Sequence, residues 1–493
     1  MKIYITGLAS GYEVEHLVRL FYPMAPLTLT PPEAGEDCVW AERKPDGLLA
    51  LVREHGGQEA VSAPLPGPDG ETEAFALASL TYDLLRRWTG IRPPWGKMTG
   101  VRPVRLIHDK RAAGWSEAEI DRFFLSRFDC SERKYQMARA IADLQEPILR
   151  LGSEPKTYSL YIGIPFCPSR CSYCSFVSCN LDRDRKLVQP YVDCLCKEVE
   201  AIRDEADKAG LKLCSIYIGG GTPTSLSAAQ LRQLMGTVRD CFDLSAIVEY
   251  TVEAGRPDTV TPEKLQAIRA AGVSRISINP QTLQDSVLQT IGRRHTVEQF
   301  YNAFDMARRA GCDHINTDLI AGLPGDTVAG FDDTLAGILA LAPESITVHT
   351  LSMKRASNLV IKHRADYTRQ EDAVHMVAHT ASQLPAAGYR PYYLYRQSRM
   401  VGNQENVGWA KPGHEGLYNV YIMDETHTIL GCGAGAVSKL KRPASDYLER
   451  IFNYKFPYEY NAGLAEMLKR KERVMTFYEE MAAQKDLGHC GDQ

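Results

Sequence analysis

The 493-residue sequence has no long hydrophobic run and no strong excess of charge of either sign. A membrane-spanning helix needs about 20 predominantly apolar residues in succession, so no membrane span is expected. The formal net charge is −4, which does not indicate nucleic-acid binding. The first residues, MKIYITGLASGYEVEHL, contain Glu13 and Glu15 before any sufficient apolar stretch, so they do not resemble a secretory signal. These absences favour a cytoplasmic protein.

The sequence also lacks internal repeats and low-complexity segments. It has 13 cysteines, but the number is odd and no export signal accompanies them, so a disulfide framework is not indicated. Scattered cysteines such as Cys38, Cys130, Cys241 and Cys312 are expected to act as small buried apolar residues. The length and the hydrophobic fraction of 44% are typical of two or three globular domains.

Three regions differ in pattern. Residues 1–155 are expected to form a separate α+β domain of unclear role, with a capping box at Ser116 and Glu119. Residues 156–388 alternate strands with helices about six times, which predicts a parallel sheet closed or partly closed into a barrel. Residues 389–493 lose the alternation and are interpreted as a C-terminal region that covers the substrate. In a barrel, the reacting groups gather at the carboxyl ends of the strands.

A cluster of cysteines follows the first strand of the alternating region. The stretch YIGIPFCPSRCSYCSF, residues 161–176, contains Cys167, Cys171 and Cys174 at the spacing C-x3-C-x2-C. Three thiolates so close together can converge on one metal or cluster, whereas a structural zinc site usually has four protein ligands. Thiolates suit iron–sulfur clusters, and an iron without a protein ligand is open to a small molecule. A zinc knuckle is the simpler alternative.

Polar groups and glycines mark the ends of the later strands. The segment YIGGGTPTSL contains a glycine run, which is often no more than a tight turn but also lets the backbone approach a ligand and leaves N–H groups exposed. Glu253, Gln281 and Asp318 end three further strands, where acidic groups can accept hydrogen bonds from ribose hydroxyls. Arg293 can pair with a carboxylate, since the two groups match in geometry. Each of these residues alone would be more typical of a cap or a surface charge.

The cysteine spacing, together with these motifs in this order, resembles the radical S-adenosylmethionine (SAM) superfamily. The resemblance implies an α/β fold: a partial (β/α)6-type radical SAM barrel with an N-terminal α+β domain and a C-terminal extension. It implies a [4Fe-4S] cluster held by three cysteines, with SAM chelating the fourth iron. The residues assigned in this way are Cys167, Cys171 and Cys174 for the cluster, Tyr161 near the sulfonium, Tyr173 and Ile320 for adenine, Gly220, Gly221 and Thr222 for the amino group, Glu253 and Asp318 for ribose, Arg293 for the carboxylate, and Gln281 as a further SAM-binding residue.

Within that superfamily, the segments YIGIPFC, GGGTPTSL, SRISINPQ and DLIAGLPG resemble the oxygen-independent coproporphyrinogen III oxidase branch. The N-terminal region and the segments near residues 392–440 resemble HemZ-type coproporphyrinogen dehydrogenases. Two positions depart from the common pattern. Gly163 stands where many members have His, and Phe176 stands where the oxidases have a fourth cysteine. A phenylalanine there is shared with haem chaperones of the same branch, so a chaperone or an enzyme acting on another tetrapyrrole stays an alternative.

The resemblance also implies the reaction. SAM would be cleaved reductively to a 5′-deoxyadenosyl radical, which removes a β-hydrogen from a substrate propionate. Loss of CO2 and one electron leaves a vinyl group, and two rounds convert coproporphyrinogen III to protoporphyrinogen IX in haem biosynthesis. The implied partners are the tetrapyrrole and an electron donor such as a flavodoxin or a ferredoxin. An oxygen-sensitive cluster suits a reducing, anaerobic setting.

Aromatic and basic residues alternate in the segment GYRPYYLYRQSRM. On a strand, Tyr393 and Tyr395 share a face. We expect Tyr393, Tyr395 and Arg396 to face the barrel mouth, with the aromatics against the macrocycle and the arginine on a propionate. A core strand with solvated charges is equally compatible with this pattern. The glycine-rich GCGAGA, residues 431–436, is a further segment whose backbone could approach the substrate or a second SAM.

Overall fold

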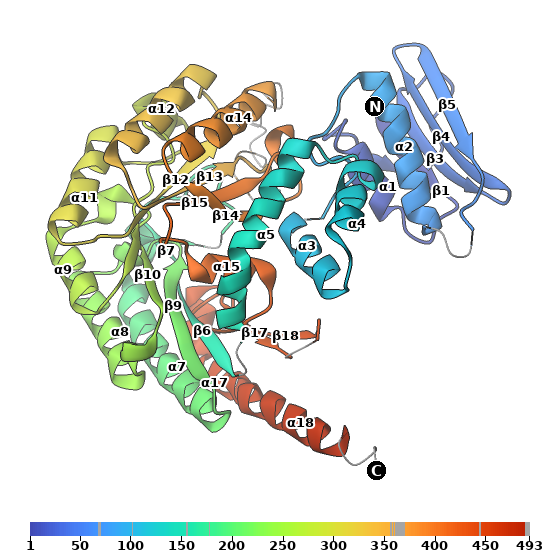
Figure 1. Ribbon diagram of the computed structural model, residues 1–493. Helices are drawn as coiled ribbons and strands as arrows, with labels where there is room; N and C mark the ends of the chain where they lie inside the picture. The colour runs from blue at the N-terminus through green and yellow to red at the C-terminus, as the bar shows by residue number, and fades with distance from the viewer. Residues whose placement is uncertain are drawn as a thin grey trace. The chain divides into compact units, whose positions relative to one another are not determined.

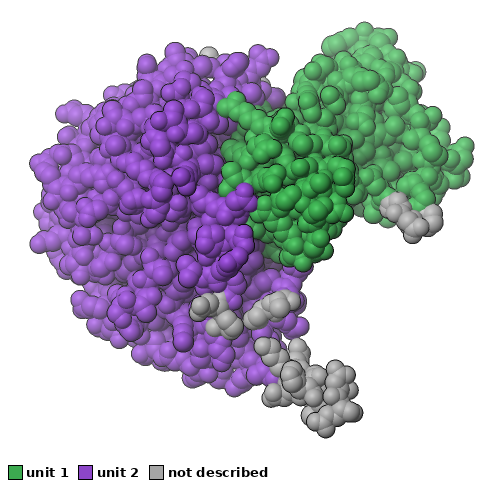
Figure 2. Space-filling view, in the orientation of Figure 1, with its two compact units in different colours: residues 1–140, 396–405 green, residues 141–395, 406–493 purple. Residues whose placement is uncertain are grey.

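The structure is a computed structural model that describes residues 1–67, 71–100, 102–153, 156–176, 178–354, 357, 359, 370–442 and 445–488. Two compact units make up the chain (Figure 2). Unit 1 consists of Met1–Ala140 and Arg396–Glu405, and unit 2 of Ile141–Tyr395 and Asn406–Gln493. This division differs from the three regions expected from the sequence, because ten residues beyond position 389 belong to the N-terminal unit. Part of the predicted linker at 152–157 lies outside the described residues.

Unit 1 is built on a five-stranded sheet in the order β2-β1-β3-β4-β5. Strand β1 pairs in parallel with β2 and β3, whereas β3, β4 and β5 form an antiparallel meander. Its elements are β1 (Lys2–Thr6), α1 (Tyr12–Val18), β2 (Leu27–Thr28), β3 (Cys38–Lys44), β4 (Gly47–Glu54), β5 (Gly57–Ala63), α2 (Glu73–Thr89), α3 (Pro103–Ala112), α4 (Glu117–Asp121), the π-helical turn η1 (Arg122–Arg127) and α5 (Glu132–Gly152), whose second half belongs to unit 2.

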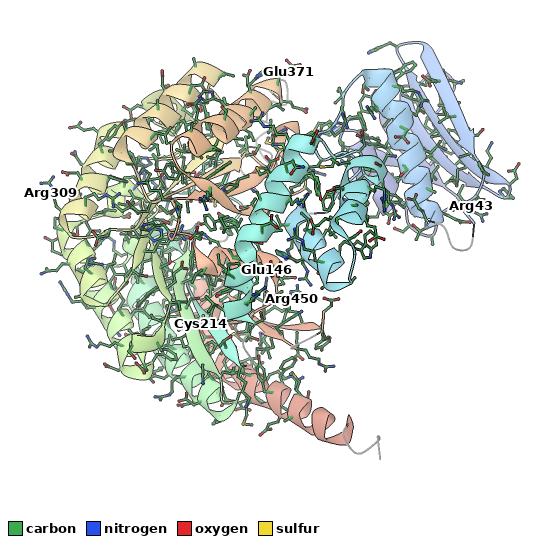
Figure 3. All side chains as sticks on the ribbon, in the orientation of Figure 1. Arg43, Glu146, Cys214, Arg309, Glu371 and Arg450 are labelled. Carbon is green, nitrogen blue, oxygen red and sulfur yellow. The ribbon has the colours of Figure 1, made fainter. Side chains whose placement is uncertain are left out.

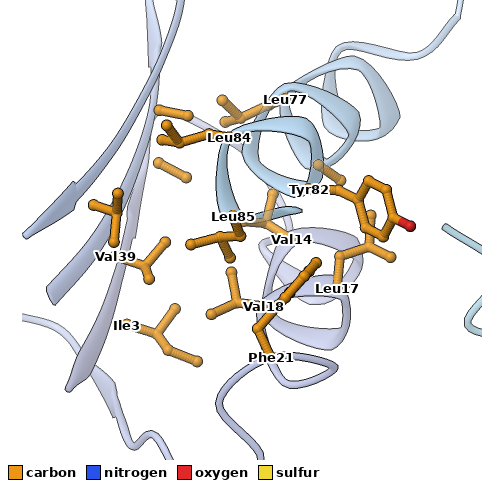
Figure 4. Packing of buried hydrophobic residues seen from close by; sticks show 14 of the residues in the cluster. Ile3, Val14, Leu17, Val18, Phe21, Val39, Leu77, Tyr82, Leu84 and Leu85 are labelled. Atoms are coloured by element: carbon orange, nitrogen blue, oxygen red, sulfur yellow. The ribbon is translucent and has the colours of Figure 1, made fainter. Parts of the chain in front are cut away.

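The core of unit 1 lies between this sheet and helices α1 and α2. Strand β4 alternates buried and half-buried residues, as expected for a strand with one face against a core. Figure 4 shows Ile3 and Val39 of the sheet facing Val18 of α1 and Leu85 of α2. The predicted capping box is confirmed: Ser116 accepts from the Glu119 N–H, and the Glu119 carboxylate accepts from the Ser116 N–H.

Unit 2 contains a sheet of eleven strands with a parallel core. Strands β6, β9, β10, β11, β12 and β13 are adjacent in chain order and mutually parallel. The first and the last of these six do not pair with each other in the described chain, so the barrel is partial. This agrees with the predicted (β/α)6-type fold. The strands are β6 (Thr157–Ile164), β9 (Lys212–Gly220), β10 (Glu249–Glu253), β11 (Arg275–Ser277), β12 (Ile315–Ala321) and β13 (Ser345–Thr350).

Helices connect these strands and cover the outer face of the curved sheet (Figure 1). Charged side chains lie on their outward faces; Arg309 at the end of α11, for example, points away from the sheet (Figure 3). A parallel sheet covered in this way buries both faces of its strands, which explains the apolar run in β6. The helices are α7 (Val188–Lys208), α8 (Ala228–Cys241), α9 (Pro262–Ala270), α10 (Asp285–Thr290), α11 (Val297–Arg309), α12 (Val328–Leu341) and α14 (Gln370–Ala386), with shorter elements β7 (Phe166–Cys167), β8 (Cys179–Asn180) and α6 (Leu181–Asp184).

The C-terminal region extends both edges of this parallel core. Strands β14 and β15 continue the sheet beyond β13, and β16, β17 and β18 continue it beyond β6. The region expected to be a separate extension therefore belongs mostly to the same sheet. Among the described residues, no helix is long and apolar enough to cross a membrane. The remaining elements are β14 (Arg390–Tyr395), β15 (Asn406–Ala410), α15 (Leu417–Asp424), β16 (Thr428–Cys432), β17 (Val437–Lys441), β18 (Leu448–Phe452), α16 (Pro457–Ala462), α17 (Leu464–Lys471) and α18 (Arg473–Gly488).

Candidate functional site

The cysteine loop follows β6 and is fixed by contacts from two later segments, one directly after α10 and one directly after β10. The Ser172 N–H donates to the carbonyl oxygen of Ile291 at 2.9 Å, and the Ser169 hydroxyl donates to that of Gly292 at 3.1 Å. The guanidinium of Arg256, which follows β10, is buried and donates to the Ser169 carbonyl oxygen at 3.2 Å. A loop between two strands is therefore held in one conformation by residues about 90–120 positions away.

Each cysteine sulfur of this loop has a hydrogen-bond donor. Thr222 Oγ1 lies 3.5 Å from Cys167 Sγ, Arg256 lies 3.8 Å from Cys171 Sγ, and a backbone N–H of Phe176 donates to the Cys174 sulfur. Burial raises the pKa of the Cys174 thiol to about 11 and also raises that of Cys167, so these thiols are protonated until a metal displaces the proton. Donors and a cation around three sulfurs suit a negatively charged thiolate centre.

The sulfurs are not arranged for a single ion. Within the described ranges, no group of three or more His, Cys, Asp or Glu side chains could hold one metal ion. A 4Fe-4S cluster places each thiolate on a different iron, so its ligands stand farther apart than those of a mononuclear zinc site. The three-cysteine donor set with its hydrogen bonds therefore fits a cluster better than the zinc alternative.

The glycine segment after β9 packs against the strand that leads into the cysteine loop. The N–H groups of Gly221 and Thr222 donate to the carbonyl oxygens of Ile164 and Phe166 at 2.8 and 2.9 Å. A Cβ at Gly221 would lie 2.7 Å from the Phe166 oxygen, so the close approach requires glycine. The expectation that the N–H groups of the glycine run are exposed is therefore wrong for Gly221. An amino group is a donor, so the carbonyl oxygens of this segment are the groups that could receive it.

Glu253 at the end of β10 has a half-buried carboxyl group with two hydrogen-bond donors. The Tyr217 hydroxyl and the Gly220 N–H both donate to it. Burial raises the pKa of Glu253 to about 7, and the nearby Asp318 carboxylate adds to the increase, while the two donors oppose it. Gly219 leaves room for this arrangement, because a Cβ there would lie 3.1 Å from the Glu253 carboxyl. The group therefore titrates near neutral pH.

Asp318 on β12 lies close to Glu253 but has the opposite pKa shift. Its two oxygens accept hydrogen bonds from the side-chain amides of Asn279 and Asn316, each at 2.8 Å. Burial alone would raise its pKa, but interactions with His349 and Asn316 outweigh burial and lower the pKa of Asp318. Asp318 is therefore ionised where Glu253 is partly protonated.

Backbone hydrogen bonds hold Gln281 and Ile320 next to Asp318. Gln281 has a φ of 71°, and its N–H donates to the Asp318 carbonyl oxygen at 3.0 Å. The Ile320 N–H in turn donates to the Gln281 carbonyl oxygen at 3.0 Å. An isolated parallel bridge between Gln281 and Leu319 of β12 thus brings Gln281, Asp318 and Ile320 together. All three were predicted to contact SAM.

Arg293 connects the cysteine loop with this group of strand ends. Its guanidinium donates to the carbonyl oxygens of Asn279 at 2.7 Å and Gly255 at 3.2 Å, and lies 3.3 Å from the hydroxyl of Tyr173. Its Nε is buried and has no hydrogen-bond partner among the described residues. A buried donor without a partner is costly, so this atom indicates a missing acceptor such as a ligand carboxylate.

Tyrosine rings fill the interior of the barrel below these polar groups. Tyr161, predicted to lie near the sulfonium, stacks with Tyr217 at 6.3 Å and with Tyr418 at 6.1 Å between ring centroids. Tyr418 comes from α15, whose first N–H groups donate to the buried carboxylate of Glu249 on β10. Tyr393 and Tyr395 stack with each other at 6.2 Å, with the Tyr393 hydroxyl 3.5 Å from Thr347 of β13.

Arg396 does not accompany these tyrosines, and the prediction that it faces the barrel mouth is wrong. Strand β14 ends at Tyr395, and Arg396 belongs to unit 1. There its guanidinium is buried, lies over the Trp95 ring at 5.6 Å from the centroid, and donates to the Met98 carbonyl oxygen. A strand turns successive side chains to opposite faces, so a residue next to Tyr395 cannot share its direction.

The GCGAGA segment is also less open than expected. The Gly433 N–H donates to the Glu198 carboxylate at 2.7 Å, and the Ala434 N–H donates to the Tyr191 hydroxyl at 2.9 Å. Both partners are buried on α7. These two backbone groups are therefore already engaged and do not point to a second SAM.

Several residues of the site have no motif in the sequence. Arg256 and His349 are examples: each lies at or just after the end of a barrel strand, which is the only sequence signal they carry. Tyr418 carries none, because it reaches the interior from a helix outside the alternating region.

Comparison with known proteins agrees with this site. A family model described as "Radical SAM superfamily" matches residues 161–337 of this chain. The oxygen-independent coproporphyrinogen-III oxidase-like protein HemZ of Bacillus subtilis is 39% identical over 404 residues, which cover 79% of this chain and 80% of the relative. The heme chaperone HemW of the same organism is 33% identical over 61% of this chain and 77% of its own.

A solved structure gives the same relationship. Coproporphyrinogen III oxidase (HemN) from Escherichia coli, described as a radical SAM enzyme, has a TM-score of 0.52 and 25% identity and covers 66% of this chain and 73% of its own. A 4Fe-4S cluster and SAM are the cofactors of this superfamily and of this protein. The chain belongs to the radical SAM superfamily, in the family of the HemZ-type oxygen-independent coproporphyrinogen-III oxidase-like proteins.

Proposed function

We propose that this protein catalyses the oxygen-independent oxidative decarboxylation of coproporphyrinogen III to protoporphyrinogen IX. The observation that carries the proposal is the extent of similarity to the HemZ relative, which is 39% identical over 79% of this chain. The identity to the HemW chaperone is 33% over 61% of the chain. Both matches extend beyond the barrel strands, where the groups that choose a substrate reside, and the larger share matched by HemZ favours the oxidase-like function.

In this proposal Cys167, Cys171 and Cys174 hold the cluster, and Arg293 Nε donates to the SAM carboxylate. Glu253 and Asp318 accept hydrogen bonds from the ribose. When bound, the cluster and SAM supply one-electron chemistry that removes a hydrogen atom from a propionate. Each turnover then releases CO2 and passes one electron to an acceptor.

The tyrosine-lined interior is compatible with a tetrapyrrole. The stacked rings of Tyr393 and Tyr395 and those of Tyr161, Tyr217 and Tyr418 offer flat apolar surface for a macrocycle. Their hydroxyls offer donors for carboxylates. Because the Arg396 guanidinium is engaged in unit 1, the propionate contacts are proposed to lie on the barrel strands. The electron donor is proposed to be a flavodoxin or a ferredoxin.

An anaerobic assay tests the proposal. Purified, cluster-reconstituted protein is mixed with coproporphyrinogen III, SAM and a reductant, and the porphyrin product is measured by mass spectrometry. We expect loss of two CO2 per substrate, with SAM consumed in proportion. The matched control is Cys171→Ala, which lacks a cluster ligand and should give no product. SAM turnover without any vinyl product would contradict the proposal.

A haem chaperone is the second candidate. Phe176 favours it: its side chain is 66% exposed beside Cys174, at the position where the oxidases of this branch have a fourth cysteine. A chaperone should bind haem tightly and yield no vinyl product. Haem titration of the same preparation, followed by its absorbance, separates this function from the proposed one. Conversion of haem itself would indicate an enzyme for another tetrapyrrole.

A further inference from the structure

His349 is a residue of the barrel mouth that no motif predicted. It lies near the carboxyl end of β13, directly opposite Ile320 in the parallel pairing with β12. Its Nε2 lies 3.7 Å from Asp318 Oδ2, and its Nδ1 lies 3.4 Å from the Tyr395 hydroxyl. The imidazole therefore stands between the carboxylate proposed for ribose and the tyrosine strand β14.

The hydrogen bonds around this imidazole have a defined direction. The Thr350 N–H donates to Asn406 Oδ1 at 2.8 Å, which turns the Asn406 amide nitrogen toward the Tyr395 hydroxyl, its other partner. Tyr395 then accepts from Asn406 and is left with its own O–H to donate to His349 Nδ1. With Nδ1 as the acceptor, the neutral imidazole carries its proton on Nε2, facing Asp318.

Asp318 has capacity for this additional donor and for a ligand. Its two oxygens each accept one amide hydrogen bond, from Asn279 and from Asn316. An ionised carboxylate offers about four acceptor positions, so two remain. At 3.7 Å the imidazole is slightly beyond hydrogen-bond distance, as is common for site contacts that tighten when a ligand binds.

We propose that His349 is a positioning residue of the SAM site: it orients the Asp318 carboxylate toward a ribose hydroxyl, and Tyr395 and Asn406 hold the imidazole in the tautomer that this requires. The proposal rests on the assignment of Asp318 to ribose but not on the identity of the tetrapyrrole. In this arrangement the side chains of Tyr395, His349 and Asp318 connect β14, a strand proposed to face the substrate, with the cofactor. Occupation of the Tyr395 face would then change the affinity for SAM.

The test measures SAM affinity by anaerobic calorimetry on cluster-loaded protein without tetrapyrrole. His349→Phe removes the Nε2 donor and should weaken SAM binding about threefold to tenfold with iron content unchanged. His349→Gln places an amide donor near the position of Nε2 and should recover most of the affinity. His349→Asn reaches only the position of Nδ1 and should not. Tyr395→Phe should weaken binding less than His349→Phe does.

A double-mutant cycle distinguishes positioning from a general structural effect. In an Asp318→Asn background, His349→Phe should cause no further loss, because the group it positions is gone. The control is His379→Phe on α14, which breaks a similar imidazole–carboxylate pair, 3.6 Å from Asp332, on the surface. It should leave SAM affinity unchanged. An unchanged affinity in His349→Phe, or the same fold loss in both backgrounds, overturns the proposal. If His349→Phe does not fold, equal affinities of the Gln and Asn variants overturn it.

The outcome is independent of the proposed reaction. No tetrapyrrole is present in these measurements, so a protein that fails to decarboxylate coproporphyrinogen III can still show the His349 effect. Conversely, if the protein decarboxylates coproporphyrinogen III but His349→Phe leaves its SAM affinity unchanged, only this inference is refuted.

Discussion

At the scale of single residues, two neighbouring carboxyl groups in the same site have opposite ionisation. Glu253 has a pKa of about 7 because it is buried beside another carboxylate, whereas the pKa of Asp318 is lowered by its imidazole and amide neighbours. Two ionised carboxylates side by side would repel each other, so Asp318 is ionised while Glu253 is partly protonated near neutral pH. A bound cation such as a sulfonium favours ionisation of both.

This difference predicts a pH dependence of SAM binding. If the ionised form of Glu253 accepts a hydrogen bond from ribose, affinity should rise as pH increases through about 7. From pH 6 to pH 8 the ionised fraction rises about tenfold, and the affinity with it. Calorimetry across this range checks the expectation. Glu253→Gln cannot titrate and should give a flat profile; an equally steep profile in that variant would assign the titration to another group.

The three cysteines of the loop give a second residue-level prediction. Cys167→Ala, Cys171→Ala or Cys174→Ala should abolish the broad iron–sulfur absorbance and SAM cleavage, since each removes one of the three proposed cluster ligands. The neighbouring Cys179→Ala is the matched control, because Cys179 lies on β8 beside Cys167 but its thiol interacts with Asp184. Retention of the cluster in Cys171→Ala, with loss in Cys179→Ala, would show that the ligand set is wrong.

At the scale of elements, the site depends on how closely β9 approaches β6. The glycine segment after β9 donates two backbone hydrogen bonds to residues 164 and 166, immediately before Cys167. The backbone of one strand end therefore supports the loop on the neighbouring strand. Side chains at Gly220 and Gly221 would separate the two, which explains these two glycines, whereas Gly219 leaves room for Glu253.

Substituting one of these glycines tests this support. In Gly221→Ala the new Cβ would meet two carbonyl oxygens at 2.7 and 2.9 Å, so the cysteine loop must move. We expect reduced iron content and a lower melting temperature. In Gly236→Ala, within α8, the Cβ meets nothing within 4 Å, and the helix should gain about 0.5–1 kcal/mol of stability. Full iron loading of Gly221→Ala would refute the role of the close approach.

Elements with strong local signals were predictable from sequence. The six barrel strands, α2 with its C-terminal Gly90, and the Ser116 capping box follow from apolar runs, glycine and cap residues that act locally. The placement of Arg396 and Tyr418 was not predictable, because it depends on contacts between segments distant in sequence. The cofactor residues were assigned by motif order, whereas Arg256 and His349 needed the three-dimensional arrangement of strand ends.

At the scale of the whole molecule, a buried ion pair joins the C-terminal helices to the barrel. The Lys471 ammonium on α17 lies 3.0 Å from the Glu198 carboxylate on α7, and both side chains are fully buried. Glu198 also accepts from the Gly433 N–H and from the amide of Asn453. This network fixes the turn after β16, the strand that pairs with β6 next to the cysteine loop.

Removing the cation should therefore be costly. Lys471→Met leaves the Glu198 carboxylate buried without its counter-charge, and we expect about 3–5 kcal/mol lower stability of unit 2. Urea unfolding measures the change. Arg309→Met, which breaks an exposed pair with Asp305 on α11, is the control and should have no measurable effect. A loss below about 1 kcal/mol in Lys471→Met would mean that the hydrogen bonds alone hold Glu198.

The discontinuity of unit 1 has a consequence for the order of events on the ribosome. Trp95 and Lys134 are made early, but their partner is Glu405, whose carboxylate lies 2.8 Å from the indole nitrogen and forms an ion pair with the ammonium. Domains generally fold in the order in which they emerge, N-terminal first. Here the first unit waits for a segment that appears only after all six parallel strands have been synthesised. All six parallel strands of the barrel are thus available for assembly while the N-terminal unit is still incomplete.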